Sequence, residues 1–336
     1  MVSEPDKKTA SAPVSALADR LSQFTARIME PVAGPFRTLP GNARGAIWIL
    51  LASFFFTVMV ALIKSVGGEI SVFQILLFRQ IVMTCTVLPI LVSGFPEILK
   101  TRHLHLHLVR VALAVVAMTC GFTAFIHLPL AEATAIGFAK SLFVTVLALF
   151  ILREVAGPRR WLAVLVGFAG VLIMVQPGPA GFNFYSILAV IAAAAAAGVM
   201  VIIRKLSRHD RSVTILSYQA IMVGLLMLVP TVYYWVTPTL EQWLIMGAIG
   251  LFSVVGQLMN IQGFKEGEAS AVAPMDYTRL IYAALIGFAV FGEVPDLDTA
   301  LGAALIIGTS IYTVRAEKRA GERSRKAEPA GDSSSS

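Results

Sequence analysis

Residues 132–175 read EATAIGFAKSLFVTVLALFILREVAGPRRWLAVLVGFAGVLIMV, and residues 268–314 read EASAVAPMDYTRLIYAALIGFAVFGEVPDLDTALGAALIIGTSIYTV. Both stretches begin Glu-Ala-(Thr/Ser)-Ala, run through an apolar helix to a Glu-Val dipeptide, and continue into a second apolar helix. The two stretches are therefore copies of one internal repeat. In a chain this apolar, such a repeat indicates a membrane protein built from two related halves.

The composition of the chain is typical of a membrane protein. Its 336 residues are 57% hydrophobic and only 14% charged, whereas a soluble domain is about 25% charged. The apolar residues fall in blocks of about 18–23, the length that crosses about 30 Å of hydrocarbon as a helix. Helices are expected because backbone polar groups in lipid must be satisfied within their own segment. The ten predicted spans are residues 45–63, 71–93, 108–127, 133–152, 159–176, 183–203, 212–234, 241–263, 270–291 and 297–314.

The positions of the basic residues predict the orientation, because cytoplasmic loops carry an excess of Lys and Arg. With the N-terminus inside, the inward segments collect nearly all of these residues, whereas the opposite loops are acidic apart from Lys64. Five helices per half is an odd number, so the second half enters the membrane upside down. The loop between the two repeat helices agrees, since it is basic in the first copy and acidic in the second. We therefore predict an all-α integral membrane protein whose ten transmembrane helices form two inverted five-helix repeats.

Four segments follow from this arrangement. They are a cytoplasmic N-terminal segment without a cleavable signal (residues 1–44), the first repeat (45–176), the second repeat (183–314) and a disordered cytoplasmic tail (315–336). The net charge of +7 reflects the orientation and the tails, so no nucleic-acid partner is expected. The expected partners are a small-molecule solute and membrane lipid, and a homodimer is left open.

Lys140 and Asp276 are the first candidates for a functional site. Each lies eight residues after the glutamate that opens its copy of the repeat, so the two positions are equivalent. An inverted repeat brings such positions toward one central region, where a Lys–Asp pair or a shared polar site is expected. Arg279, three residues after Asp276, is an alternative partner for the acid, and Pro274 is expected to loosen this helix. The other interpretation is an ion pair that locks the two halves together without binding a solute.

Further polar side chains lie inside the predicted spans. An arginine within an apolar span is costly and seldom faces lipid, which makes Arg79 a candidate; alternatively it binds neighbouring backbone carbonyls. Gln257 and Asn260 either line a cavity or hydrogen-bond between helices, and Tyr277 places a hydroxyl beside Asp276. The alternating histidines within residues 103–107 have no cysteine or carboxylate at ligand spacing. They indicate an interfacial connector, and neither a metal nor a cofactor is expected.

The repeat resembles that of the drug/metabolite transporter superfamily, EamA type. The resemblance rests on LPLAEATA at 128–135, Arg-Glu at 153–154 and residues 161–171 in the first copy, and on residues 269–312, with GEVPD at 292–296, in the second. It implies ten helices in the inner membrane, both termini in the cytoplasm, and alternating-access movement of small organic solutes without ATP. Arg79 matches an arginine that this family often carries in its second helix. The small four-helix multidrug members use an acidic residue in helix 1, which this chain lacks.

The leading hypothesis is secondary transport of a small organic metabolite. The charges within the predicted spans are Arg79, Lys140 and Arg279 against Asp276, and this positive excess favours an anionic, zwitterionic or vitamin-like solute, such as an amino acid, a nucleotide-like compound or riboflavin. If Asp276 is held by Arg279, uniport or exchange is expected instead of proton coupling. The alternatives are a lipid-carrier flippase on the same fold and a cationic drug exporter. The sequence contains no P-loop, H-E-x-x-H or G-x-S-x-G motif, so an enzyme is not expected.

Overall fold

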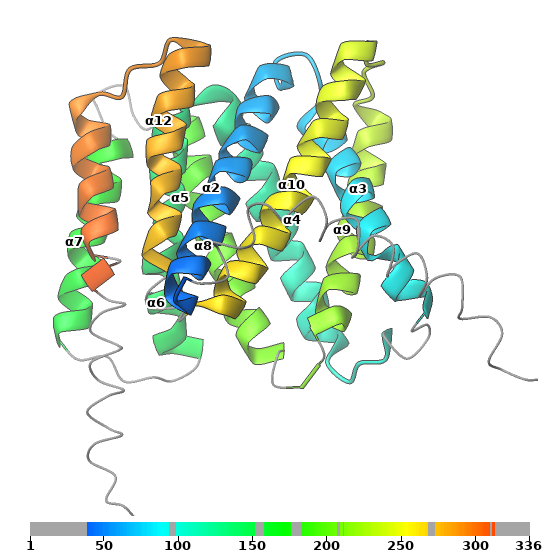
Figure 1. The fold of residues 1–336 in the computed structure, drawn as a ribbon, viewed down its shortest axis with the longest axis horizontal. Helices are drawn as coiled ribbons and strands as arrows, with labels where there is room; N and C mark the ends of the chain where they lie inside the picture. The colour runs from blue at the N-terminus through cyan, green and yellow to red at the C-terminus, as the bar shows by residue number, and fades with distance from the viewer. Residues whose placement is uncertain are drawn as a thin grey trace, which may run out of the picture.

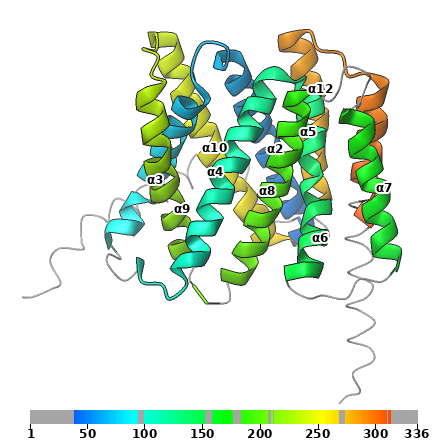
Figure 2. The ribbon, with the colours of Figure 1, turned by 180° about the vertical axis from the view of Figure 1, so that it is seen from behind.

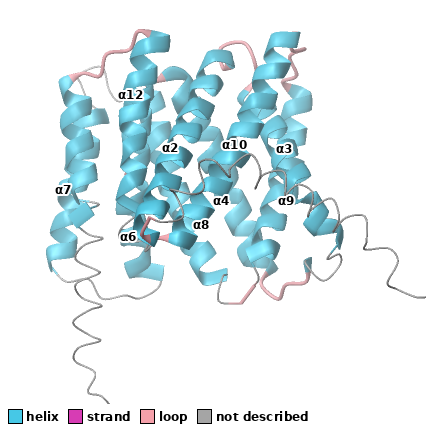
Figure 3. Cartoon of the chain, viewed as in Figure 1, coloured by secondary structure: helices cyan, strands magenta, loops and turns pink. Residues whose placement is uncertain are grey.

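The computed structural model describes residues 39–93, 99–151, 158–175, 183–206, 209–210, 212–267, 273–309 and 311–312. All regular secondary structure in these residues is helical (Figure 3). Five helical segments in the described part are long and apolar enough to cross a membrane, namely Gly41–Val66, Leu104–His127, Leu130–Leu147, Phe184–Ile203 and Leu240–Glu266. Shorter apolar helices lie among them, which gives a multi-pass helical protein.

The described helices stand side by side in one bundle (Figure 1). Those of the first half are α2 (Gly41–Val66), α3 (Val72–Ser93), α4 (Leu104–His127), α5 (Leu130–Phe138), α6 (Lys140–Ile151) and α7 (Pro158–Val175). Those of the second half are α8 (Phe184–Leu206), α9 (Ser212–Tyr233), α10 (Leu240–Glu266), the 3₁₀ segment η2 (Ala273–Tyr277), α12 (Thr278–Phe291) and the helix Leu297–Thr309.

The packing partners of the two halves correspond. The first helix of the first half, α2, packs most closely on α10, the third helix of the second half. The first helix of the second half, α8, packs in the same way on α4, the third helix of the first half. Likewise α12 packs on α2 as α6 packs on α8. The starting helices also run in opposite directions, since α2 rises from the bottom of Figure 1 whereas α8 descends from the top in Figure 2.

Glycines allow the closest of these helix contacts. A Cβ on Gly45 of α2 would lie 2.8 Å from the carbonyl oxygen of Gly263 on α10. A Cβ on Gly170 of α7 would lie 2.9 Å from the carbonyl oxygen of Gly302 in the helix Leu297–Thr309. Any side chain at these positions would push the backbones apart, so small residues bring the helices together as they do in other membrane bundles.

Two predicted spans depart locally from regular α-helix. The span 133–152 was predicted as one helix, and α5 and α6 follow each other with Ala139 alone between them. Ala139 keeps right-handed helical dihedral angles and takes part in one tighter 3₁₀ turn, so Leu130–Leu147 still forms one segment long enough to cross a membrane. The span 270–291 begins with the 3₁₀ segment η2, as expected from Pro274, which cannot donate a backbone hydrogen bond.

Several predictions fall on residues outside the described part. They include residues 1–38 of the N-terminal segment, the Glu-Val dipeptide at 154–155 and the tail 315–336. The end of the N-terminal segment at residue 44 stays a prediction; α2 begins at Gly41.

Candidate functional site

Lys140 and Asp276 both lie beside a short departure from regular α-helical geometry, which we call a helix interruption. Lys140 is the first residue of α6, directly after the break at Ala139, and Asp276 lies in η2, directly before α12. A hydroxyl satisfies one carbonyl at each interruption. Ser141 Oγ donates to the Phe138 oxygen at 2.9 Å, and Thr278 Oγ1 donates to the Met275 oxygen at 2.6 Å. A similar hydroxyl-to-carbonyl bond therefore accompanies both places.

Asp276 is held by two donors from different elements. Ser53 Oγ of α2 donates to Asp276 Oδ1 at 3.0 Å, and the guanidinium of Arg279 donates to the same oxygen at 2.7 Å. Ser53 is fully buried, and the side chains of Asp276 and Arg279 are each 23% exposed. Charge-assisted bonds of this kind are the stronger hydrogen bonds in proteins, so the carboxylate is fixed between α2 and its own helix.

Lys140 shares the region of this ion pair. It is half-buried and lies within electrostatic range of both Asp276 and Arg279. Of the two alternatives left open by the sequence, the direct ion pair of Asp276 is with Arg279. Lys140 therefore adds a positive charge to a region where the other two charges already compensate each other.

Aromatic rings surround the Asp276 region. The guanidinium carbon of Arg279 lies 4.9 Å from the ring centre of Phe56 on α2, a distance at which a cation is attracted to a ring face. Tyr277 meets Phe138 of α5 edge to face, with 4.9 Å between the ring centres. Tyr277 therefore bridges the two helix interruptions, because Phe138 is the last residue of α5.

The remaining predicted site residues lie apart from this ion pair. Arg79 of α3 lies 6.0 Å from the ring centre of Phe122 on α4, and it is not among the charges that act on Asp276. Gln257 and Asn260 are half-buried on α10, and neither is among the described partners of Asp276. Asp276, Tyr277 and Arg279 thus lie together with Lys140 within electrostatic range, whereas the described contact of Arg79 is Phe122. A role of these residues in solute binding stays a prediction.

A cluster at one end of the bundle was missed by the sequence. We define the Asp210 cluster as Asp210, His107 and Thr101. Asp210 Oδ2 lies 2.8 Å from His107 Nε2 and accepts a hydrogen bond from Thr101 Oγ1 at 2.7 Å. Partial burial favours the neutral acid, but the hydrogen bonds from His107 and Thr101 outweigh it and hold the pKa of Asp210 below its usual value. The cluster joins the start of α4 to the turn between α8 and α9.

The segment around the histidines was assigned wrongly. Residues 103–107 were predicted as a connector, but α4 begins at Leu104, and His107 is fully buried. Arg110, inside the predicted span 108–127, is 1% exposed and donates to the Ile215 oxygen at 3.0 Å and to Gln219. One signal could have identified this face, because His107 and Arg110 lie three residues apart and so share a helix side.

A second cluster joins the halves at the opposite end, where the C-terminal ends of α2 and α12 lie at the top of Figure 1. We define the Lys64 cluster as Lys64, Glu293, Leu128 and Leu130. Lys64 pairs with Glu293 and donates to the Leu128 oxygen at 2.5 Å, while the Leu130 amide donates to Glu293 at 2.7 Å. The signal in the sequence was Lys64 itself, the basic residue in otherwise acidic loops.

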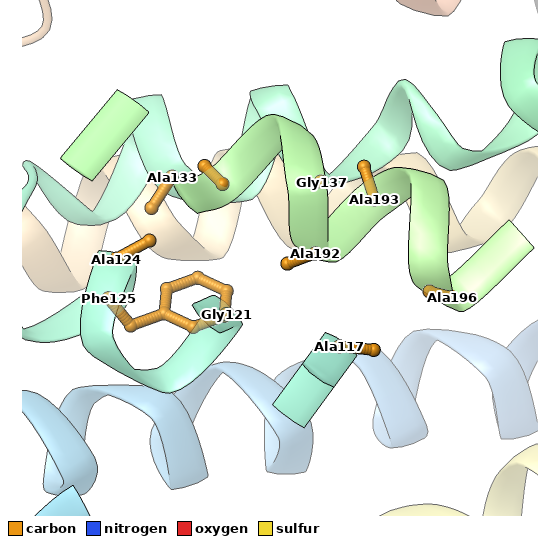
Figure 4. A pocket seen from close by; sticks show the side chains of 10 residues that line it. Ala117, Gly121, Ala124, Phe125, Ala133, Gly137, Ala192, Ala193 and Ala196 are labelled. Carbon is orange, nitrogen blue, oxygen red and sulfur yellow. The ribbon is translucent and has the colours of Figure 1, made fainter. Parts of the chain in front are cut away.

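One cavity lies beside the first helix interruption (Figure 4). Its volume is about 150 Å³. It is lined by small and apolar residues of α4, α5 and α8, namely Ala117, Gly121, Ala124, Phe125, Ala133, Gly137, Ala189, Ala192, Ala193 and Ala196. Sites for small molecules usually enclose about 300–1,000 Å³, so this cavity is too small for a metabolite. Among the residues that the structure describes, no three His, Cys, Asp or Glu side chains gather as metal ligands.

Comparison with known proteins gives a consistent result. The EamA-like transporter family matches residues 43–176 and again residues 183–315. An S-adenosylmethionine uptake transporter of Rickettsia prowazekii is 29% identical over 278 residues, covering 82% of this chain and 94% of the relative. A riboflavin transporter of Vibrio cholerae is 30% identical over 287 residues, covering 84% and 96%. A pseudopaline exporter of Pseudomonas aeruginosa is 30% identical over 278 residues, covering 82% and 97%.

A solved crystal structure is similar in fold. It matches with a TM-score of 0.54 at 18% identity, covering 82% of this chain and 98% of that chain. At this level of identity the likeness shows the fold alone.

Proposed function

Because the chain belongs to the EamA-like transporter family, we propose that it moves a small organic metabolite across the membrane by ATP-independent alternating access. The relatives named above transport small molecules, and members of this family are transporters, not enzymes. They include uptake proteins and an exporter, so the family gives the type of activity without its direction.

The proposed architecture has ten transmembrane helices in two inverted repeats, residues 45–176 and 183–314. The corresponding packing of α2 on α10 and of α8 on α4 supports it, as do the opposite directions of α2 and α8. The Lys and Arg residues favour cytoplasmic termini in an inner membrane. Inverted repeats suit alternating access because each half can take up the conformation that the other half had. This exchange moves the opening from one side of the membrane to the other.

The observation on which the proposed site rests is that two equivalent places of the repeats, each with a short 3₁₀ departure from α-helix, bring charged side chains together. Local departures from α-helix at the interface of two repeats are a common basis for solute sites in secondary transporters. Here the two interruptions carry Lys140 and Asp276, and Tyr277 packs on Phe138 between them. With Asp276 compensated by Arg279, Lys140 supplies an extra positive charge near the centre. This favours an anionic, zwitterionic or vitamin-like solute, such as an amino acid, a nucleotide-like compound or riboflavin.

The clusters at the two ends supply the proposed gates. The Lys64 cluster joins α2 and α5 to the segment after α12, and the Asp210 cluster joins α4 to the turn after α8. Each therefore ties one half to the other at one end of the bundle. In alternating access these ties open in turn, and the helices repack around a solute-sized space larger than the cavity of about 150 Å³.

The partners of Asp276 favour uniport or exchange. A proton on this carboxylate would weaken the ion pair with Arg279, which the fold supports with the further bond from Ser53. Uptake is therefore expected to survive the collapse of a proton gradient, and to be accelerated by solute on the opposite side of the membrane.

The test is transport by purified protein in sealed vesicles. S-adenosylmethionine, riboflavin, amino acids and nucleotides are offered in labelled form, with and without unlabelled solute inside. At least one is expected to enter faster than into protein-free vesicles. Asp276→Ala abolishes that entry, and Lys140→Ala lowers it about 10- to 100-fold. Gly247→Ala is the matched control, because a methyl group there meets nothing within 4 Å. Full activity of both site variants would contradict the proposed site.

A further inference from the structure

Two arginines of this bundle differ in their hydrogen bonds. Arg110 of α4 is buried and donates to the Ile215 oxygen and to Gln219, and so ties α4 to α9. Arg79 of α3 is half-buried and has no hydrogen bond or ion pair among the described residues, while the Nε atoms of both arginines are buried without a partner. The described contact of Arg79 is the ring of Phe122, 6.0 Å from the guanidinium carbon. Arg110 therefore links two helices of the fold, whereas Arg79 makes no such link through a described hydrogen bond or ion pair.

An uncompensated guanidinium in this position is unfavourable for the empty protein. Removing a charge from water is costly unless it is paired and hydrogen-bonded, and a ring face replaces little of the lost hydration. A guanidinium has donors only, so whatever satisfies it must bring acceptor atoms. A negatively charged acceptor would also compensate the charge, and carboxylate and phosphate groups match the planar fork of arginine.

A second unsatisfied group lies on the same side of α4. Thr119 Oγ1 is buried without a hydrogen-bond partner. Thr119 precedes Phe122 by three residues, which places both on one helix face, and Phe122 is the residue that Arg79 covers. Buried polar groups are almost always hydrogen-bonded. Arg79 and Thr119 can therefore each donate a hydrogen bond to a ligand that brings acceptor atoms.

We propose that Arg79 is the anion-binding residue of the solute site, accepting a carboxylate or phosphate group with help from the Thr119 hydroxyl. This rests on the proposed transport function and narrows its substrate to solutes that bear such a group. Phe122 holds the guanidinium plane in place. Uncharged flat molecules are then excluded as the main substrate. The Asp276 region contacts another part of the solute.

The first arm of the test compares the two arginines by melting temperature in detergent without added organic anions. Arg79→Gln is expected to melt at or above the wild-type temperature, because it removes an uncompensated charge. Arg110→Gln is expected to melt several degrees lower, because it leaves Gln219 and the Ile215 oxygen without a donor. If Arg110→Gln does not fold, Gln219→Ala replaces it, since it removes one partner of the same arginine.

The second arm measures stabilisation by matched probes at constant ionic strength. Adenosine monophosphate is compared with adenosine, succinate with succinamide, and inorganic phosphate with chloride. The charged member of a pair is expected to raise the wild-type melting temperature through binding to the folded state. Arg79→Gln loses this shift, and Arg79→Lys restores part of it.

Three results would overturn the inference. They are a loss of stability in Arg79→Gln as large as in Arg110→Gln, an equal shift by the charged and uncharged probes, or an anion shift that persists in Arg79→Gln. Failure of the proposed function gives a different result. In that case vesicles would carry no solute, while the anion shift and its dependence on Arg79 would remain.

Discussion

The two helix interruptions have the same construction and opposite charges. At each, a hydroxyl satisfies a carbonyl three residues earlier, Ser141 in the first half and Thr278 in the second. The first then presents Lys140 and the second presents Asp276. The acid has fixed partners in Ser53 and Arg279, whereas no hydrogen bond or ion pair to Lys140 is found in the part of the chain that the structure describes. Both halves therefore have a hydroxyl-to-carbonyl bond at this place, whereas the two charged side chains differ in their partners.

The largest expected effect is at Asp276, because its side chain is held by Ser53 and Arg279. Asp276→Ala leaves Arg279 half-buried without its acid, so the protein should lose about 2–3 kcal/mol of unfolding free energy together with transport. Urea unfolding of the purified protein measures the first and vesicle uptake the second. The double variant Asp276→Ala/Arg279→Ala should be more stable than the single variant. Equal stability of the single and the double variant would contradict the ion pair between Asp276 and Arg279.

Lys140→Ala should separate transport from stability. Because Lys140 has no described bonding partner, the melting temperature is expected to change little. Loss of one charge-assisted bond to the solute should reduce uptake about 10- to 100-fold. Initial rates at several solute concentrations, beside melting curves, give both quantities. A fall in stability as large as that of Asp276→Ala would make Lys140 a structural residue.

The clusters at the two ends extend the comparison between halves. Lys64→Met should cost about 1–2 kcal/mol of stability, because the side chains of Lys64 and Glu293 are only 13% and 19% exposed. Because Lys64 links the two halves, Lys64→Met should also change the uptake rate more than the solute affinity. Uptake measured over a range of solute concentrations tests this. An unchanged rate with weakened binding would argue against a gate.

The smallest expected effect concerns acid. The folded-state pKa of Asp210 is below its usual value, so its contribution to stability is present above about pH 4 and is lost as the pH falls through the lower folded value. Asp210→Asn should therefore lose about 1 kcal/mol near pH 7 and have a flatter melting profile between about pH 5 and pH 3. Melting temperatures across this range provide the measurement, and a profile as steep as that of the wild type would contradict the hydrogen bonds of the Asp210 cluster.

Much of the helical framework could be predicted from the sequence, because lipid forces apolar blocks into helices of nearly fixed length. The neighbourhood of Lys140 and Asp276 was also predictable, since the repeat relates residues 136 positions apart in the chain. A loosened helix was predicted from Pro274, which cannot donate a backbone hydrogen bond, and the structure has the 3₁₀ segment η2 there.

The missed features share two physical causes. The 3₁₀ turn at Ala139 lies within an apolar block, where hydrophobicity is the same on both sides and no proline marks the change. The partners of His107 and Arg110 lie more than 100 residues away in α9 and the turn before it. Which distant side chains meet depends on packing, and a single sequence does not contain that information. The charges in the first turns of α4 also made a buried helix face look like a loop.

The central claim is that one site between the two interruptions faces each side of the membrane in turn. It can be tested with Lys140→Cys in a background where Cys85 and Cys120, the free cysteines of the described chain, are serine. A membrane-impermeant thiol reagent is applied to sealed vesicles from outside or from inside, with protein of known orientation. The account predicts labelling of position 140 from both sides, slowed by a transported solute. Labelling from one side alone, at any solute concentration, would contradict it.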